Sequence, residues 1–406
     1  MELLKAKKMN KRKTLSEKTR LVHPQKVELP KGNKPLVSPI HQSVKYTPEN
    51  MAQFKSILAG RGQGYLYSRI SNPTVRELEL ALADLQGRED ALATASGIGA
   101  LTAVAMTFLN SGDSVAVFTE SYKPTRLLLG GILQRFGVRV LRFDRDDYES
   151  FDASCKSPHP PKMLFFESPT NPVLRIHDIE RLVKTAKKAG CLTVLDNTFA
   201  GFLAHREFAV DFYIHSLTKL ASGHSDAMGG VIIGHSKLID SIFPVAMTLG
   251  ACLDPNSAWL ISRGMKTYLL RLRESSRSAL EIASWLTNQS WAKNVMYPAL
   301  PSHPDHMLWK KQNNGDGGSV ITFDVNCQES KLDVFLDSLR VFKVTPSLGC
   351  VESLAVPCLT LYGDDLTPED ARKAGIRHNT IRLAIGIEDI DDLKSDIESA
   401  AAAVQN

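Results

Sequence analysis

One lysine of this chain stands where its amine could act as a nucleophile. The apolar run at residues 212–214 is typical of a buried strand, and it leads into a polar turn that contains Ser216 and Thr218 and ends in Lys219. Burial lowers the pKa of a lysine, because low-dielectric surroundings disfavour the charged ammonium. A neutral amine can form a Schiff base with a carbonyl group, and the two hydroxyls would suit phosphate oxygens. Taken alone, the same run is also typical of a surface lysine in a loop.

A carboxylate and a run of small residues precede this lysine. Asp196 ends the apolar run 192–196, 23 residues before Lys219, so one strand-to-strand step separates the two side chains. Residues 95–100 are small except for Ile98 and lead into an apolar helix, whose free N–H groups and dipole could bind a phosphate. Each feature has an ordinary alternative: a helix-capping aspartate in one case and a plain helix start in the other.

Together these features predict a site for pyridoxal 5′-phosphate (PLP). Their order along the chain is phosphate anchor, acid and lysine. A carboxylate beside the pyridine nitrogen keeps that nitrogen protonated, and the ring can then accept electrons from a carbanion. The combination is far more specific than any one of its parts.

The surrounding pattern indicates an α/β fold that would position these residues. A helix is expected from Pro73, which suits a first turn, to the stop at Gly87. Short apolar runs then alternate with helical segments such as 179–189, which favours a mostly parallel sheet covered on both faces. The expected strands are residues 114–118, 138–143, 162–166, 192–196, 211–214 and 230–233. Ligands bind such sheets at the carboxyl ends of strands, where Glu167, Asp196 and Ser216 fall.

The pattern of predicted helices, strands and irregular stretches divides the chain into three parts. Residues 1–69 are expected to form an N-terminal arm that contributes to a neighbouring subunit's site and is irregular to about residue 60. Residues 70–260 are expected to form a cofactor-binding α/β domain, and 261–406 a smaller α+β domain. The last part has long helical stretches at 257–289 and short strands at 318–325, 340–345 and 380–384.

Composition excludes several classes of protein. The net charge of +5 comes from residues 1–20, which hold eight Lys or Arg and two Glu, leaving 41 basic and 42 acidic residues elsewhere. We therefore expect no nucleic-acid partner, and no apolar run is long enough for a membrane span. The basic tail is read as an arm, with a targeting or anionic-surface role as the alternative. The six cysteines form no CxxC pair, so a reduced, cytoplasmic protein without a metal site is expected.

Several stretches of the chain resemble the Cys/Met-metabolism family of PLP enzymes. This family includes cystathionine γ-synthase, the cystathionine lyases, methionine γ-lyase and O-acetylhomoserine sulfhydrylase, and it has the PLP fold type I of aspartate aminotransferase. The matching stretches lie between about residues 19 and 400. They are residues 67–74, 167–172, 196–198, 216–219 with 223–226, 347–349 with 351–353, and 381–383 with 386–389.

The resemblance implies a cofactor-binding role for several residues. Tyr122 would stack on the PLP ring and Asn171 would hydrogen-bond its phenolic oxygen. The backbone of Gly97 and Ile98 would bind the phosphate together with Ser216 and Thr218. Tyr67 and Arg69 would reach the phosphate in a neighbouring subunit, which implies an obligate oligomer, expected as a homotetramer built from two dimers.

The resemblance also implies how an amino-acid substrate would be held. Arg382 would clamp the α-carboxylate, because a guanidinium fork makes two parallel charge-assisted bonds to a carboxylate. Ser347 would help to hold that carboxylate or Lys219. Glu352 would face a distal amino group. Lys219, Tyr122 and Asp196 would carry the catalysis.

Some positions depart from the family pattern. Pro124 stands where methionine γ-lyases carry cysteine, and Leu127, preceded by Arg126, stands where cystathionine enzymes carry an arginine. The stretch 355–360 also lacks the usual His-Pro-Ala. We expect γ-replacement or γ-elimination on a sulfur amino acid or O-acylhomoserine, of the cystathionine γ-synthase or γ-lyase type. The alternatives are methionine γ-lyase or O-acylhomoserine sulfhydrylase, an aminotransferase, and a non-catalytic scaffold with the PLP fold.

Overall fold

The computed structural model describes residues 16, 19, 29–59, 64–313, 317–363 and 365–405. It divides into two units, Met1–Pro39 and Ile40–Asn406. The described part of the first unit is largely exposed to solvent. All of the predicted site lies in the second unit, which the following paragraphs describe.

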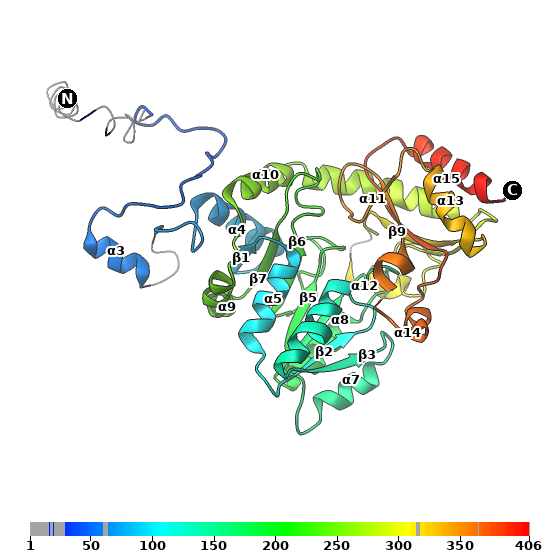
Figure 1. Ribbon diagram of the computed structural model, residues 1–406, viewed down its shortest axis with the longest axis horizontal. Coiled ribbons are helices and arrows are strands. Elements are labelled where there is room, and N and C mark those ends of the chain that lie inside the picture. The colour runs from blue at the N-terminus through cyan, green and yellow to red at the C-terminus, as the bar shows by residue number, and fades with distance from the viewer. Residues whose placement is uncertain are drawn as a thin grey trace. The chain divides into compact units, whose positions relative to one another are not determined.

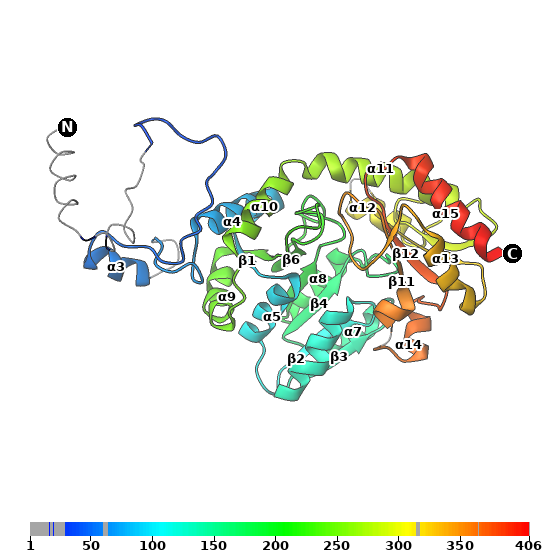
Figure 2. The ribbon, with the colours of Figure 1, turned by 45° about the horizontal axis from the view of Figure 1, so that its top comes forward.

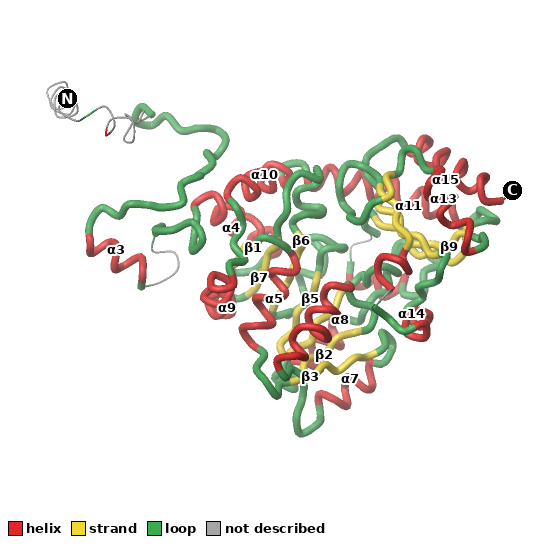
Figure 3. Tube along the Cα trace, viewed as in Figure 1, coloured by secondary structure: helices red, strands yellow, loops and turns green. Residues whose placement is uncertain are grey.

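A seven-stranded sheet forms the centre of this unit (Figures 1 and 3), in the order β1-β7-β6-β5-β4-β2-β3. The five strands from β6 to β3 pair in parallel, whereas β7 runs antiparallel to both β1 and β6. The mostly parallel α/β sheet predicted from the sequence is therefore confirmed. The strands are β1 (Asp90–Thr94), β2 (Ser114–Phe118), β3 (Arg139–Phe143), β4 (Met163–Glu167), β5 (Leu192–Asp196), β6 (Phe212–Ser216) and β7 (Gly230–Gly234).

Helices bury both faces of this sheet. Successive side chains of a strand point to opposite faces, so Phe166 packs in one hydrophobic cluster and Phe165 in another. The first cluster includes residues of α4 (Pro73–Gln86), α7 (Tyr148–Cys155), α8 (Ile179–Lys188) and α10 (Pro255–Met265). The second includes residues of α5 (Gly97–Phe108), α9 (Ser236–Leu249), and the short turns η1 (Leu127–Ile132) and η2 (Leu133–Phe136).

The helix predicted from its caps is confirmed. The Asn72 side chain accepts a hydrogen bond from the backbone N–H of Thr74, and Pro73 occupies the first turn, where its missing N–H costs nothing. Gly87 ends α4 with a φ of 69°, in the left-handed region that glycine adopts without a Cβ penalty. A short helix, α6 (Lys123–Arg126), follows β2 and carries part of the site.

A second, five-stranded sheet has the order β10-β11-β12-β9-β8. In Figure 2 it lies beside the first sheet, together with α13 and α15. Its core unites strand residues such as Ile381 and Phe323 with these helices and with α11. The elements are α11 (Tyr268–Leu286), β8 (Ala292–Met296), α12 (His306–Gln312), β9 (Val320–Val325), η3 (Glu329–Lys331), α13 (Leu332–Ser338), β10 (Lys343–Val344), β11 (Leu354–Pro357), η4 (Leu359–Gly363), α14 (Pro368–Lys373), β12 (Thr380–Ala384) and α15 (Ile390–Gln405).

Some sequence predictions need correction. The arm was expected to be irregular to about residue 60, but α3 (Met51–Leu58) is a helix whose N-cap Asn50 accepts from the N–H of Gln53. Strand β1 was not predicted, because its Asp-Ala-Leu-Ala-Thr sequence has little β propensity and pairing with β7 decides its conformation. The two sheets fall on either side of residue 260, and the domain boundaries stay a prediction. Among the described residues no helix is long and apolar enough to cross a membrane.

Candidate active site

A cavity of about 460 Å³ lies where β4, β5 and β6 end, as predicted for ligands of parallel sheets. It is lined by side chains from both sheets and from the loops between them. Most of the residues predicted for the site meet here. They are Gly97, Ile98, Tyr122, Asn171, Asp196, Ser216, Thr218, Lys219, Ser347 and Arg382.

The amine of Lys219 lies inside this cavity and not on the surface. Its Nζ donates to the hydroxyl oxygen of Ser347 at 2.9 Å. Burial, reinforced by the positive charge of Arg382, lowers the pKa of Lys219 to about 8. An ordinary lysine has a pKa near 10.4, so this amine is neutral far more often at neutral pH and can act as a nucleophile.

Asp196 ends the strand next to the one that leads to Lys219, because β5 and β6 pair in parallel. Its Oδ1 accepts from the backbone N–H of Thr198 at 3.1 Å and from the Thr198 hydroxyl at 2.6 Å. Burial nevertheless raises the pKa of Asp196. A cation in the cavity would stabilise this carboxylate, and a protonated ring nitrogen is such a cation.

The N-terminus of α5 lies against the end of β6. A Cβ added at Gly97 would lie 3.0 Å from the Cβ of Ser216, so a larger residue would crowd this junction. Ser96 caps the helix by accepting from the N–H of Gly99 at 3.1 Å. The first N–H groups of the helix have no intrahelical acceptor and lie beside the hydroxyl-bearing residues Ser216 and Thr218, which line the same cavity.

Tyr122 lies at the start of α6 and is tied to β4. Its backbone N–H donates to Oε1 of Glu167, a buried residue of β4. Glu167 lies opposite Asp196 where β4 pairs with β5. Burial raises the pKa of Glu167 well above its usual value, and the nearby Asp196 charge adds to this effect. Burial also raises the pKa of the Tyr122 hydroxyl, so it stays protonated at neutral pH.

Arg382 is a buried cation without an acidic partner among the described residues. It is 2% exposed and alternates along β12 with Ile381 and Leu383, which face the core of the second sheet. Its Nη1 donates to Oδ1 of Asn171 at 2.9 Å and its Nη2 to the carbonyl of Ser347 at 2.8 Å. Its Nε is buried with no hydrogen-bond partner. An anionic ligand would satisfy both the charge and the free donor.

Three predicted residues do not line this cavity. Glu352 is exposed, and its Oε2 lies 3.5 Å from the hydroxyl of Ser225. Arg69 donates to the carbonyl of Met247 at 2.8 Å and stands 5.6 Å from the ring centroid of Tyr67, which is 37% exposed. The roles predicted for these three residues stay predictions.

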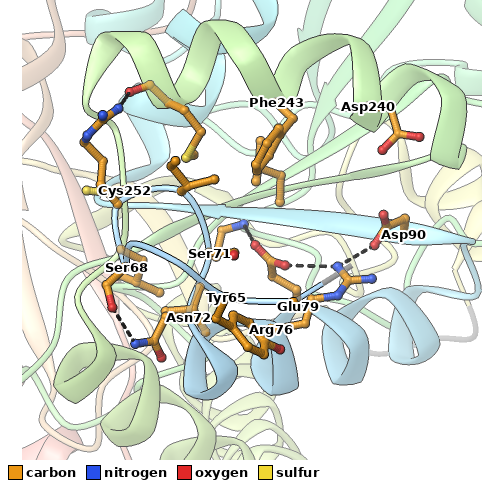
Figure 4. A pocket seen from close by; sticks show the side chains of 18 residues that line it. Tyr65, Ser68, Ser71, Asn72, Arg76, Glu79, Asp90, Asp240, Phe243 and Cys252 are labelled. Carbon is orange, nitrogen blue, oxygen red and sulfur yellow. Dashed lines mark hydrogen bonds and ion pairs between the residues drawn. The ribbon is translucent and has the colours of Figure 1, made fainter. Parts of the chain in front are cut away.

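Arg69 lines a second cavity, of about 250 Å³, between α4, β1 and α9 (Figure 4). Several polar side chains that line this second cavity already bond to one another. Arg76 reaches Glu79 at 3.0 Å and Asp90 at 2.7 Å, and Asn72 donates to Ser68 at 3.0 Å. This cavity shares no residue with the one that holds Lys219.

Sequence reasoning missed some residues that line the larger cavity. Tyr362 places its ring 4.8 Å from the Arg382 guanidinium, and Phe199 places its ring at 5.8 Å on the same group. Phe199 directly follows Asp196-Asn197-Thr198, which could have drawn notice to it. Tyr362 carries no such signal, since it lies beyond the stretch 355–360 and in no motif of the family.

The cavity fits PLP on its own geometry. The Lys219 amine has a lowered pKa, and the Asp196 carboxylate has a raised one. Gly97 begins a helix where there is little room for a side chain, and the buried Arg382 has an Nε without a hydrogen-bond partner. The helix start would hold the phosphate, Asp196 the ring nitrogen and Lys219 the aldehyde carbon. All of these residues lie within one cavity.

Comparison with known proteins agrees with this geometry. Residues 18–402 match the family described as Cys/Met metabolism PLP-dependent enzyme. The chain belongs to this family. The PLP cofactor, the enzyme class and the type I fold predicted from the sequence are therefore confirmed.

Several curated relatives resemble most of the chain. The O-succinylhomoserine sulfhydrylase of Pseudomonas aeruginosa is 37% identical over 362 residues, 88% of this chain and 89% of that protein. The cystathionine gamma-lyase of Bacillus subtilis is 38% identical over 355 residues, covering 86% and 92%. The L-methionine gamma-lyase of Pseudomonas putida is 35% identical over 372 residues, covering 91% and 93%.

Solved structures agree in fold. A putative O-acetylhomoserine (thiol)-lyase from Campylobacter jejuni, which holds a pyridoxyl-lysine phosphate, has a TM-score of 0.86 and 30% identity, covering 90% of this chain and 95% of that one. Cystathionine gamma synthase from Xanthomonas oryzae pv. oryzae in complex with cystathionine has a TM-score of 0.83 and 32% identity, covering 91% and 93%.

Proposed function

We propose that this family member catalyses γ-replacement or γ-elimination on a sulfur amino acid or an O-acylhomoserine. The observation that carries the proposal is the buried Arg382, which has no acidic partner among the described residues and lines the same cavity as Lys219. An α-amino acid has both groups that this pair selects: a carboxylate for the guanidinium fork and an amino group for the position held by the lysine amine.

Each residue has a separate task in the proposed reaction. When bound, PLP supplies a protonated ring that takes up the electron pair released as a C–H bond at the substrate α-carbon breaks. Asp196 keeps the ring nitrogen protonated, and Arg382 fixes the α-carboxylate. Lys219 Nζ accepts the α-proton and delivers it to the carbon on the other side of the substrate nitrogen. The same amine, steadied by Ser347, then removes a proton from the β-carbon, and the electron pair left there expels the γ-group. The group on the γ-carbon then leaves, and either a thiol replaces it or 2-oxobutanoate and ammonia are released.

The choice among γ-reactions rests on the residues around Tyr122. Pro124 lines the cavity where methionine γ-lyases carry cysteine, which favours the cystathionine γ-synthase or γ-lyase type. Leu127 is 45% exposed and outside the cavity lining, so it offers no contact to a distal carboxylate. Glu352 would select substrates with a distal amino group. Methionine γ-lyase and O-acylhomoserine sulfhydrylase activities stay the alternatives.

We place this enzyme in a homotetramer built from two dimers. Tyr67 and Arg69 lie outside their own chain's Lys219 cavity, as expected of residues that serve a neighbouring site. Helix α3 buries none of its residues, and Met51, Phe54 and Leu58 on it are exposed apolar side chains that a second copy would cover. We also place the enzyme in the cytoplasm, where its six free cysteines would stay reduced.

One substrate panel tests the proposed function. The holoenzyme would be offered O-succinylhomoserine and O-acetylhomoserine with cysteine or sulfide, and then cystathionine or methionine alone, with products identified by mass. Cystathionine or 2-oxobutanoate as product supports the γ-reaction. Stoichiometric conversion of the cofactor to its amine form by an amino donor would indicate an aminotransferase. A normal PLP spectrum without any turnover would indicate a non-catalytic scaffold.

A further inference from the structure

Arg126 is a fully engaged buried arginine next to the active site. It is 2% exposed, and all five of its N–H groups have acceptors. Its Nε and Nη2 form a fork on the carboxylate of Asp365, at 2.9 and 2.6 Å. Nη2 also donates to the carbonyl of Tyr362 at 2.6 Å, while Nη1 donates to the carbonyls of Ser121 and Thr119.

These bonds join two segments that both line the cavity. Ser121 and Arg126 flank Tyr122, whereas Tyr362 and Asp365 belong to the η4 turn and the residues after it, 239 positions later than Arg126 in the case of Asp365. Among the described residues, the carbonyl of Tyr362 and the side chain of Asp365 hydrogen-bond to Arg126 alone, so this arginine ties the end of the turn to the segment around Tyr122.

Tyr362 in turn packs on the substrate-binding cation. Its ring centroid lies 4.8 Å from the guanidinium carbon of Arg382, and the ring is 5% exposed. A desolvated cation over an aromatic face is attracted by the ring quadrupole. Hydrogen bonds from Nη1 to Asn171 and from Nη2 to the Ser347 carbonyl also hold the Arg382 guanidinium, and the Tyr362 side chain interacts with the same group. The ring therefore adds an orienting contact to these bonds.

We propose that Arg126 is a positioning residue: its fork on Asp365 sets Tyr362 against Arg382 and so orients the guanidinium for the α-carboxylate of the substrate. This inference rests on the proposed role of Arg382 in carboxylate binding. Lysine cannot replace Arg126, because an ammonium lacks the planar fork that reaches a carboxylate and a carbonyl together.

Binding of glycine and glycinamide to the holoenzyme tests the proposal. Neither has a γ-carbon, so only binding is followed, through the change in visible absorbance of the cofactor. The parent should bind glycine more tightly than glycinamide. Arg126→Met, Arg126→Lys and Tyr362→Leu should each lower this acid-over-amide preference about tenfold, while glycinamide affinity and cofactor loading stay near the parent values.

Arg145→Met is the matched control. Arg145 is also a buried arginine paired with a distant aspartate, Asp305, but it does not line the cavity. It should keep the preference within about twofold. An equal loss in Arg145→Met, or an unchanged preference in Tyr362→Leu, would overturn the proposal. Tyr362→Leu leaves the Arg126–Asp365 fork in place, so it decides the matter even if the Arg126 variants fail to fold.

Arg382→Leu separates the two levels of inference. If this variant keeps the parent preference for glycine, Arg382 is not the carboxylate clamp, and the proposed function fails with it. If Arg382→Leu abolishes the preference but Arg126→Met and Tyr362→Leu retain it, Arg382 keeps its role and the positioning role of Arg126 is overturned.

Discussion

The amine of Lys219 lies 2.9 Å from the hydroxyl oxygen of Ser347, a residue 128 positions later in the chain. This contact brings the loop after β10 of the second sheet to the end of β6 of the first. The same loop accepts from Arg382 through the Ser347 carbonyl, at 2.8 Å. The second sheet therefore contributes to both the nucleophile and the carboxylate site.

Borohydride reduction should trap the cofactor on Lys219. The amine lies half-buried in the cavity and has the lowered pKa that attack on an aldehyde requires. Peptide mapping by mass spectrometry would locate the adduct, and Lys219→Ala should give none while keeping the fold by circular dichroism. A stable adduct on another lysine would refute the assignment.

Replacing Asp196 with alanine should slow turnover by at least about 2 kcal/mol of activation free energy, the scale of one preorganised electrostatic contact. The variant should still fold, because the substitution removes the charge interaction with the cofactor ring and not a packing contact. Steady-state kinetics at saturating substrate would measure the effect. Asp211→Ala, which removes a carboxylate from the start of the neighbouring strand, is the control and should turn over near the parent rate. Near-normal turnover in Asp196→Ala would remove its role.

Cofactor capture by the apoenzyme should depend on pH with a midpoint near 8. Burial and the Arg382 charge lower the pKa of Lys219 to about 8, so the reactive neutral amine is lost as pH falls below that value. The capture rate should drop about tenfold per pH unit on the acid side and level off above pH 8. Arg382→Leu removes a nearby positive charge, which raises the Lys219 pKa and moves the midpoint to higher pH. A rate that is flat between pH 6 and 9 would contradict this assignment.

Mixed oligomers should recover activity if Arg69 serves a neighbouring site. Lys219→Ala and Arg69→Ala chains are each expected to be inactive, but random pairing should restore roughly a quarter of parent activity, because one site in each hybrid dimer is complete. Lys219→Ala mixed with Asp196→Ala is the control, since both residues lie in the same chain's cavity, and it should stay inactive. A fully active monomer in sedimentation would end the idea.

Glu352→Ala should reduce the preference for cystathionine over methionine by roughly two- to fivefold, the worth of an ion pair between an exposed carboxylate and an ammonium. The ratio of kcat/KM for the two substrates measures this preference. Lys343→Ala, which changes another exposed residue outside the cavity lining, should leave the ratio unchanged. If the parent itself prefers methionine, methionine γ-lyase becomes the favoured function.

Local patterns in the sequence determined the core of this site. Asp196 and Lys219 could be paired in advance because consecutive parallel strands end at the same edge of a sheet, as β5 and β6 do. The caps of α4 and the helix start at Gly97 could also be predicted from the sequence, since their hydrogen bonds span only two or three residues.

Contacts between distant segments were decided only by the tertiary structure. Tyr362 gave no signal because its role depends on Arg382 and Arg126, which lie on other elements and whose hydrogen bonds cross up to 239 positions. The sequence showed that Leu127 stands where cystathionine enzymes carry an arginine. Only the tertiary structure shows that the neighbouring Arg126 is buried and paired with Asp365. Such pairs depend on how two sheets pack against each other, and no local periodicity encodes that arrangement.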